Sequence, residues 1–385
     1  MDSIELFSGI GGLGIGVQNA GFQHVLAIEK NNKCFETIQH NINQGLMQVS
    51  NWPILKQDIK SYCFKSFENK ITLVSGGPPC QPFSLGGKHK ADIDSRDMFP
   101  ETIRAIREIK PKAFIFENVK GLTRNSFSNY FEYIRLQLTY PDMVKKYSET
   151  WLEHLSKLEA QFANGSHNGL SYNVLVKVLN SADYGVPQNR ERVFIVGFRS
   201  DVSSEWSFPK PTHSHIALRW SKEYGNYWDE NCVPKRERII ETSQSKSLEE
   251  LSSQPLTRPW NTLRWAISDL PDPERHTKKS LQFHNHKYQP GARIYKGHTG
   301  SVLDEPSKTL KAGFHGVPGG ENMIRRHDGS VRYFSVRESA RLQGFPDEFS
   351  FECSWGESMR QLGNAVPIEL ATILVKSIKS TLMKK

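Results

Sequence analysis

Short apolar runs alternate with helical-period stretches between residues 4 and 198, and this alternation constrains the fold more than any other feature of the chain. Strands that are buried on both faces are encoded by continuous apolar runs. The pattern therefore predicts an α/β fold with a doubly wound, mostly parallel sheet, whose ligands bind at the carboxyl ends of the strands. The predicted strands are residues 4–7, 25–28, 71–74, 113–116, 172–178 and 193–198.

The pattern changes beyond the sixth predicted strand, where prolines punctuate a stretch with little helical periodicity. We therefore expect a catalytic and cofactor-binding domain over residues 1–199 and a smaller, irregular domain over 200–324. Helical periodicity returns at 336–343 and in a closing amphipathic stretch, 368–382. Residues 325–385 should thus form a segment that returns to the first domain.

An insert, residues 141–165, separates the fourth and fifth predicted strands. Apolar residues from Met143 to Phe162 recur at spacings of three or four, and Tyr147 is one of them. This stripe predicts one helix whose apolar side packs on the rest of the domain.

Composition narrows the class of protein without identifying it. The 385 residues carry a formal net charge of +9, which suits an anionic partner. Five cysteines without C-x-x-C spacing argue against a disulfide framework or a zinc ribbon and favour a reducing compartment. We expect all of them except Cys80 to be core thiols. The lack of a basic leader and of a long apolar run predicts a cytoplasmic protein that neither enters nor crosses a membrane.

The loop after the first predicted strand has the spacing of a nucleotide-binding turn. Its glycines are Gly9, Gly11 and Gly14, which satisfy G-x-G-x-x-G. Glu29, at the end of the second predicted strand, could accept hydrogen bonds from ribose hydroxyls. Phe7 could stack on an adenine, and Asp58 could accept its amino group. These features fit an adenosine-bearing cofactor, with an NAD-dependent dehydrogenase or a purely structural glycine turn as alternatives.

Cys80 stands among three prolines directly after the third predicted strand, within the segment Gly76–Ser84. Proline fixes φ, so this frame would hold the sulfur in one place at the carboxyl edge of the sheet. A structural cysteine seldom needs such a frame, whereas a nucleophile does. We therefore predict a nucleophilic thiol, with a structural turn as the alternative.

Glu117 ends the fourth predicted strand. The carboxyl ends of parallel strands lie at one edge, so Glu117 and Cys80 could act on the same substrate. Partial desolvation there would favour a protonated carboxyl group that serves as hydrogen-bond donor or general acid. A helix cap is the alternative role.

Six motifs stand in the order found in the DNA cytosine-5 methyltransferases, and the chain resembles that family, in its bacterial restriction-modification type. The motifs are Phe7-Ser8-Gly9-Ile10-Gly11-Gly12, Pro78-Pro79-Cys80, Glu117-Asn118-Val119, Gln188-Asn189-Arg190-Glu191-Arg192, Arg337–Pro346 and Gly363-Asn364-Ala365-Val366-Pro367.

The resemblance implies transfer of a methyl group from S-adenosylmethionine to carbon 5 of a cytosine flipped out of double-stranded DNA. Cys80 would attack carbon 6, Glu117 would bond or protonate ring nitrogen 3, and Arg192 would hold the base or its phosphate. No metal is implied. The cofactor would contact Phe7, Ser8, Gly9, Gly11, Gly12, Glu29, Asp58, Ile59, Pro79, Asn364 and Val366, with the closing helix beside the glycine loop.

Residues 200–324 stand where the family has its target-recognition domain, and residues 81–99 resemble its mobile loop over DNA. The candidate DNA contacts are Ser84, Lys88, Arg96, Arg190, Arg258, Arg264, Arg293 and Lys296. Arg190 could instead hold a loop. The sequence does not separate base readers from phosphate contacts.

Two other functions share the same motifs. One is a transfer-RNA cytosine-5 methyltransferase, although the chain lacks the Cys-Phe-Thr motif of that branch. The other is a catalytically inactive DNA-binding relative, against which the intact Cys80, Glu117 and Arg192 argue. We expect a monomer that is paired functionally with a restriction endonuclease without forming a stable complex.

Overall fold

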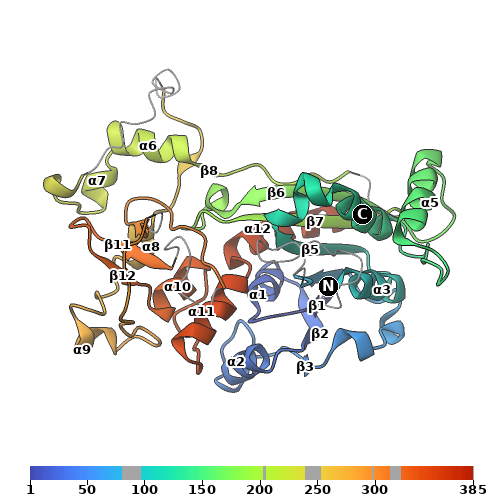
Figure 1. The fold of residues 1–385 in the computed structure, drawn as a ribbon, viewed down its shortest axis with the longest axis horizontal. Coiled ribbons are helices and arrows are strands. Elements are labelled where there is room, and N and C mark those ends of the chain that lie inside the picture. The colour runs from blue at the N-terminus through green and yellow to red at the C-terminus, as the bar shows by residue number, and fades with distance from the viewer. Residues whose placement is uncertain (80–96, 203–204, 239–252, 297–298, 313–321, 385) are drawn as a thin grey trace. The chain divides into compact units, whose positions relative to one another are not determined.

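The computed structural model describes residues 1–79, 97–202, 205–238, 253–296, 299–312 and 322–384 (Figure 1). The chain divides into two compact units. Unit 1 comprises Met1–Leu179, Glu191–Pro209 and Ala371–Lys385, and unit 2 comprises Asn180–Arg190 and Lys210–Leu370. The assignment of catalysis to one domain and target recognition to the other stays a prediction.

Unit 1 is built on a mostly parallel sheet. Its strands are β1 (Asp2–Leu6), β2 (Gln23–Glu29), β3 (Ile54–Lys56), β4 (Leu73–Gly76), β5 (Ala113–Val119), β6 (Tyr172–Asn180) and β7 (Glu191–Arg199). Among the described residues the order is β3-β2-β1-β4-β5-β7-β6. β1 pairs in parallel with β2 and β4, and β7 runs antiparallel to β5. This arrangement confirms the predicted doubly wound fold.

Helices cover the sheet and bury its apolar strands. They are α1 (Gly12–Asn19), α2 (Asn32–Asn43), α3 (Phe99–Ile109), α4 (Ser128–Thr139), α5 (Trp151–Asn164) and α12 (Ile368–Leu382). Short 3-10 turns are η1 (Ile59–Ser61), η2 (Lys65–Phe67), η4 (Lys120–Thr123) and η5 (Asn125–Phe127) in unit 1, and η6 (Ser181–Tyr184) and η7 (Lys235–Glu237) in unit 2. Ile4, Phe114 and Ile195 are fully buried in the core of unit 1. Each such side chain contributes roughly 1.5–3 kcal/mol relative to exposure.

The closing helix α12 confirms the prediction from its amphipathic stretch. Leu374, Val375 and Ile378 are fully buried. A Cβ added to Gly16 would lie 2.4 Å from the Cβ of Ala371, so α1 and α12 pack too closely for a larger residue there. The helix that follows the glycine loop therefore packs directly against the end of the chain.

The insert forms a shorter helix than its apolar stripe predicts. α5 begins at Trp151, and Tyr147 lies outside it, fully exposed. Thr150 fixes this start, because its hydroxyl accepts the Glu153 N–H at 3.2 Å while its own N–H donates to the Glu153 carboxylate at 2.8 Å. The prediction of one helix from Met143 onward was therefore wrong, although the later part of the stripe is buried at Leu158.

Unit 2 consists of short elements. Its strands are β8 (His213–Ser214), β9 (Arg258–Pro259), β10 (Ser301–Val302), β11 (Met323–Arg325) and β12 (Val331–Tyr333). Its helices are α6 (His215–Glu223), α7 (Tyr227–Glu230), α8 (Leu263–Ile267), α9 (Thr277–Ser280), α10 (Val336–Leu342) and α11 (Trp355–Asn364). The predicted helix at 336–343 is confirmed, and the irregularity of the preceding stretch is evident in strands of two or three residues.

The described cysteines differ in exposure. Cys34 is buried, Cys353 is half-buried, and Cys63 and Cys232 are exposed. The prediction that all of them are core thiols was therefore wrong. Cys63 follows η1 in a loop and Cys232 adopts φ 50° after α7, so neither stands in an element that faces a core. Within the described ranges, no helix is both long and apolar enough to span a bilayer.

Candidate active site

The carboxyl ends of β1 and β4 lie side by side at the point where the strand order reverses. Leu6 pairs with Gly76 in adjacent parallel strands, so the loops that begin at Phe7 and Gly77 leave the sheet together. Open α/β sheets bind ligands at such a reversal. The two loops that the sequence singles out, one rich in glycine and one leading to Cys80, therefore start at the same place.

The loop after β1 is held in an unusual backbone conformation. Phe7, Gly9 and Gly11 have φ of 55°, 56° and 86°, values that disfavour residues with a Cβ. A Cβ on Gly14 would lie 2.4 Å from the ring of Trp52, so this glycine is required by packing. The glycine spacing thus serves both the turn and the contact with Trp52.

Glu29 fastens this loop from the end of β2. Its Oε2 accepts the Gly9 N–H at 2.7 Å and its Oε1 accepts the Asn31 N–H at 2.6 Å. The residue is 9% exposed. The carboxylate is therefore fixed beside the loop in the position that the sequence assigns to a ribose-binding acid.

Asp58 follows β3, and a lysine side chain and a backbone N–H both contact its carboxylate. Lys30 Nζ lies 2.6 Å from its Oδ2, and the Lys60 N–H donates to its Oδ1 at 3.0 Å. The hydrogen bond from Lys30 lowers the pKa of Asp58, which keeps the carboxylate ionised. The adjoining Ile59 is buried. An adenine amino group at Asp58 would share the carboxylate with Lys30.

The polar groups at this edge fit an adenosine-bearing cofactor. Within the part of the chain that the structure describes, the buried Ser8 hydroxyl has no hydrogen-bond partner. Phe7 is only half-buried, and a Cβ on Gly9 would meet no atom within 4 Å. The loop therefore combines an unsatisfied hydroxyl, a partly open aromatic ring and open space beside its backbone.

The loop after β4 is described as far as Pro79. Cys80, Ser84, Lys88 and Arg96 lie outside the described residues, so their roles stay predictions. Up to Pro79 the loop is anchored, because the Asn118 side-chain amide donates to the Pro78 carbonyl at 2.9 Å. Asn118 belongs to the motif Glu117-Asn118-Val119, but this anchoring role was not predicted for it.

Glu117 and Arg192 form an ion pair beside that loop. Arg192 Nε lies 2.9 Å from Glu117 Oε1, and the two side chains are 14% and 9% exposed. The pair joins neighbouring strands, since Arg192 stands opposite Val119 in the β5–β7 register. Burial lowers the pKa of Arg192, while the Glu117 carboxylate opposes this shift. Two of the three predicted catalytic side chains are thus brought into contact.

The same ion pair bears on the predicted protonation of the Glu117 carboxyl group. Burial disfavours the charged form of Glu117, but an adjacent guanidinium favours the carboxylate. A Cβ added to Gly77 would lie 3.6 Å from Glu117 Oε2. The carboxyl group therefore faces both a cation and the start of the cysteine loop.

Arg190 does not have the environment of a DNA contact. It is 1% exposed, and its guanidinium donates to the carbonyls of Leu310, Gly363 and Ala365 at 3.0, 2.7 and 2.9 Å. A phosphate has no access to a guanidinium buried in this way. The DNA-binding prediction for Arg190 was wrong, and the alternative, that it holds a loop, agrees with the geometry.

The other candidate DNA contacts of unit 2 differ among themselves. Arg264 pairs with Asp304, whose two carboxylate oxygens accept hydrogen bonds from its Nε and Nη2 at 2.7 and 3.1 Å. Arg258, Arg293 and Lys296 are exposed. Their predicted roles remain open, whereas the geometry of Arg264 favours a structural role.

The two predicted cofactor residues near the closing helix belong to unit 2. Asn364 is exposed and Val366 is buried at 5% exposure. Their contact with a cofactor stays a prediction.

Glu5 is a buried acid that the sequence analysis missed. It is 1% exposed in β1, and Ser75 of the neighbouring strand β4 donates a hydrogen bond to it. Burial raises the pKa of Glu5 to about 8, against a smaller opposing effect of Ser75. An acidic residue inside an apolar run was the available signal. The pair links the two strands whose ends carry the cofactor loop and the cysteine loop.

A family model described as C-5 cytosine-specific DNA methylase matches residues 1–141 and 149–380. The gap in the match, residues 142–148, falls in the insert before α5.

Several known proteins are similar to this chain. The Type II methyltransferase M.PspPI of Psychrobacter sp. (strain TA137) is 32% identical over 379 residues, which cover 97% of this chain and 78% of that protein. The Type II methyltransferase M.FnuDI of Fusobacterium nucleatum is 31% identical over 394 residues, which cover 100% of this chain and 96% of that protein.

Solved structures share the fold. The S. pombe Dnmt2 methyltransferase has a TM-score of 0.55 at 19% identity, with coverage of 98% of this chain and 97% of that chain. The Entamoeba histolytica methyltransferase EhMeth has a TM-score of 0.57 at 14% identity, with coverage of 100% of this chain and 98% of that chain. At these identities the likeness concerns the fold alone.

Proposed function

Because the chain belongs to the C-5 cytosine-specific DNA methylases, we propose that it methylates a flipped-out cytosine in a specific double-stranded DNA sequence through a covalent bond to Cys80. Membership makes the chain a DNA (cytosine-5-)-methyltransferase. The covalent route, the use of S-adenosylmethionine by particular residues and the biological role are the proposal.

The meeting of the two loops with Glu117 is the observation that carries the proposal. Leu6 and Gly76 are register neighbours, and Asn118 holds Pro78 two residues before Cys80. The chain thus enters the cysteine segment beside the ion pair of Glu117 and Arg192. This supports a single site in which a thiol, a carboxyl group and a guanidinium act on one ring.

S-adenosylmethionine would supply an electrophilic methyl group bonded to a sulfonium sulfur. Glu29 would accept hydrogen bonds from the ribose hydroxyls, and Phe7 would stack on the adenine. The Ser8 hydroxyl would donate to the amino-acid end of the cofactor. Among the described residues this buried hydroxyl has no hydrogen-bond partner, and buried polar groups normally have one, which supports a polar ligand here. The remaining cofactor contacts in this proposal are Gly9, Gly11, Gly12, Asp58, Ile59, Pro79, Asn364 and Val366.

The thiolate of Cys80 is needed because carbon 5 of cytosine is a poor nucleophile. Attack of the sulfur on carbon 6 forms a C–S bond and turns the ring into an enamine, so that carbon 5 can take the methyl group. Loss of the proton from carbon 5 then expels the sulfur by β-elimination. The thiolate and the aromatic ring are restored, the proton leaves to a base, and the sulfonium of the donor is left as a neutral thioether.

Glu117 and Arg192 would manage the charge that develops at ring nitrogen 3. A hydrogen bond shared between Glu117 and that nitrogen stabilises the ring after sulfur attack. Arg192, held 2.9 Å from the carboxylate, would orient it and could also hold the base or its phosphate. The base must leave the helix stack first, because carbon 6 is inaccessible within a duplex.

The biological role would be protection of DNA from a cognate restriction endonuclease, as the Type II naming of the relatives suggests for those proteins. Phosphate and base contacts would come from Ser84, Lys88, Arg96, Arg258, Arg293 and Lys296. The enzyme would act as a monomer, without a stable complex with the endonuclease.

Replacing the nucleophile tests the proposal. We expect Cys80→Ser to abolish methyl transfer from a radiolabelled donor to duplex DNA while the variant still binds S-adenosylmethionine in calorimetry. Cys63→Ser, at an exposed cysteine, is the matched control and should keep wild-type activity. Full activity of Cys80→Ser would refute the covalent route. Methylation of transfer RNA but not of DNA by the wild type would refute the proposed substrate.

A further inference from the structure

Unit 2 contains a cavity of about 530 Å³ whose walls are dominated by charged side chains. Four arginines and three acidic residues line it, together with His327, Leu303 and Ile324. None of these residues is among the DNA contacts that the sequence predicts. The cavity thus lies outside the site already described.

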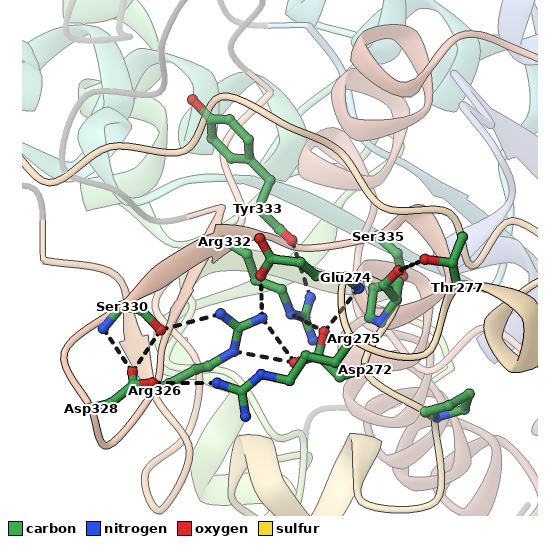
Figure 2. Close-up of polar contacts among 12 residues, drawn as sticks. Asp272, Glu274, Arg275, Thr277, Arg326, Asp328, Ser330, Arg332, Tyr333 and Ser335 are labelled. Carbon is green, nitrogen blue, oxygen red and sulfur yellow. Dashed lines mark hydrogen bonds and ion pairs between the residues drawn. The ribbon is translucent and has the colours of Figure 1, made fainter.

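Arg326 and Arg332, which are less exposed than Arg236 and Arg275, define the floor of the cavity, and both form ion pairs. Arg326 donates to Asp272 Oδ2 at 2.9 Å and to Glu274 at 2.5 Å, and it also reaches the Ser330 hydroxyl (Figure 2). Arg332 makes two hydrogen bonds to Glu338, at 2.7 and 2.6 Å, with both side chains at 5% exposure or less. Both floor arginines are paired with acids of the same unit, so the floor serves as a scaffold.

The mouth of the cavity carries two weaker pairs. Arg275 lies 3.3 Å from Asp328, and the two side chains are 58% and 57% exposed. Arg236 is 86% exposed and lies 3.8 Å from Glu237. Glu237 is 27% exposed, and the other three groups are more exposed. Pairs that reach solvent in this way contribute little to stability, so their groups can turn to another partner at small cost.

Asp328 is held in place for such a role. It belongs to the turn between β11 and β12, and its Oδ1 accepts both the Ser330 N–H at 2.9 Å and the Ser330 hydroxyl at 2.6 Å. These hydrogen bonds lower the pKa of Asp328 and keep it ionised. Its Oδ2 faces Arg275 at the cavity mouth (Figure 2).

We propose that the pairs Arg236–Glu237 and Arg275–Asp328 read G·C base pairs of the substrate DNA through the major groove. Guanine presents two adjacent acceptors, O6 and N7, which match the fork of a guanidinium, and cytosine presents an amino donor that matches a carboxylate. Each pair holds both groups side by side. The inference rests on the proposed function and specifies which side chains provide its sequence preference.

The acid beside each arginine distinguishes these base readers from residues that contact phosphates. A phosphate beside Arg236 or Arg275 would also meet the carboxylate of Glu237 or Asp328, which repels it. The stretch 276–296 offers better phosphate partners, since it contains five Lys or Arg residues and no acidic residue. Exposed examples are Lys278, Lys279 and Lys287. Arginines beside an acid thus read bases, and these exposed lysines contact the backbone.

Base analogues test the assignment. Bisulfite sequencing of DNA from an expressing host first gives the wild-type recognition sequence. Duplexes with 7-deazaguanine at one position at a time then remove N7 without altering pairing. For the wild type, we expect the analogue at one particular position to lower kcat/KM about 5- to 150-fold. For Arg275→Gln, the analogue at that position should lower kcat/KM no further. Arg236→Gln should behave likewise at another position.

Lys279→Gln is the matched control. It should weaken binding to all sequences alike and lower the salt dependence of binding, with the full analogue sensitivity retained. If Arg275→Gln and Arg236→Gln behave like this control, the base-reading role is overturned. A wild type that methylates no DNA would instead overturn the proposed function. Unchanged thermal unfolding of both arginine variants, expected from their exposure, excludes a folding defect.

Discussion

The two units place their charged residues in opposite ways. In unit 1 a large apolar core supports the sheet, and two of its buried acids, Glu29 and Glu117, lie at or near the strand ends. In unit 2 the elements are short, and buried arginines bind the carbonyls of distant segments, as Arg190 does, or a nearby acid, as Arg332 does. In the proposed mechanism, the buried acids at the sheet edge of unit 1 serve chemistry, whereas the buried ion pairs of unit 2 hold segments together.

This difference predicts which kind of defect a substitution causes. Loss of a buried acid at the sheet edge should affect turnover with little effect on folding. Loss of a buried acid in unit 2 should affect folding first.

Glu117→Gln should give the largest difference between the effect on turnover and the effect on folding. The amide keeps the shape of the side chain but cannot carry the proton or charge that assists ring nitrogen 3, so we expect kcat to fall by about 10²- to 10⁴-fold. Single-turnover methylation of duplex DNA measures this loss. The cofactor dissociation constant is the control and should stay within about twofold. A kcat near that of the wild type would remove Glu117 from the mechanism.

Glu338→Ala is the counterpart in unit 2. It leaves Arg332 buried without its main partner and also removes the cap at the start of α10, where Ser335 N–H donates to Glu338 at 2.8 Å. We expect the free energy of unfolding to fall by about 3–5 kcal/mol. Urea unfolding measures the change, with Arg275→Gln at an exposed pair as a control that should lose less than about 1 kcal/mol. Equal losses in the two variants would contradict the scaffold role of the floor.

Glu5→Gln tests how a buried acid inside a strand of unit 1 affects the pH dependence of stability. The carboxyl group of Glu5 has a folded-state pKa of about 8, above its ordinary value of 4.5, so the folded protein retains a proton that the unfolded chain releases. Stability from this group should therefore fall as pH rises from about 4.5 to about 8, by up to about 1.4 kcal/mol per pH unit.

The amide of Glu5→Gln cannot ionise, so the variant should lose that slope and be the more stable protein at pH 8. Denaturant unfolding at pH 6, 7 and 8 gives the comparison. Parallel pH profiles of the two proteins would show that Glu5 does not titrate in this range.

The sequence predicted unit 1 better than unit 2, for a physical reason. Continuous apolar runs encode strands buried on both faces, and loops at their carboxyl ends must share one edge, so the apolar pattern alone was enough to assign Glu29 and Glu117 to that edge. The start of α5 was mispredicted because a local capping box at Thr150 outweighs an apolar period that extends further.

Roles that depend on long-range contacts could not be predicted. Arg190 was assigned to DNA because a basic residue in a motif looks exposed, whereas its partners lie more than a hundred residues away along the chain. Arg264 and Asp304 show the same problem over a shorter separation. The floor of the unit 2 cavity was missed entirely, since it joins segments that carry no common local pattern.

Trapping on a modified base tests the central mechanism most directly. Duplexes that contain 5-fluorocytosine at the target position block β-elimination, because fluorine cannot leave carbon 5 as the proton does. With S-adenosylmethionine present, we predict a stable protein–DNA adduct that resists denaturation and whose peptide, identified by mass spectrometry, is modified at Cys80. Efficient methylation of ordinary duplexes without any adduct at residue 80 on the fluorinated ones would contradict the account.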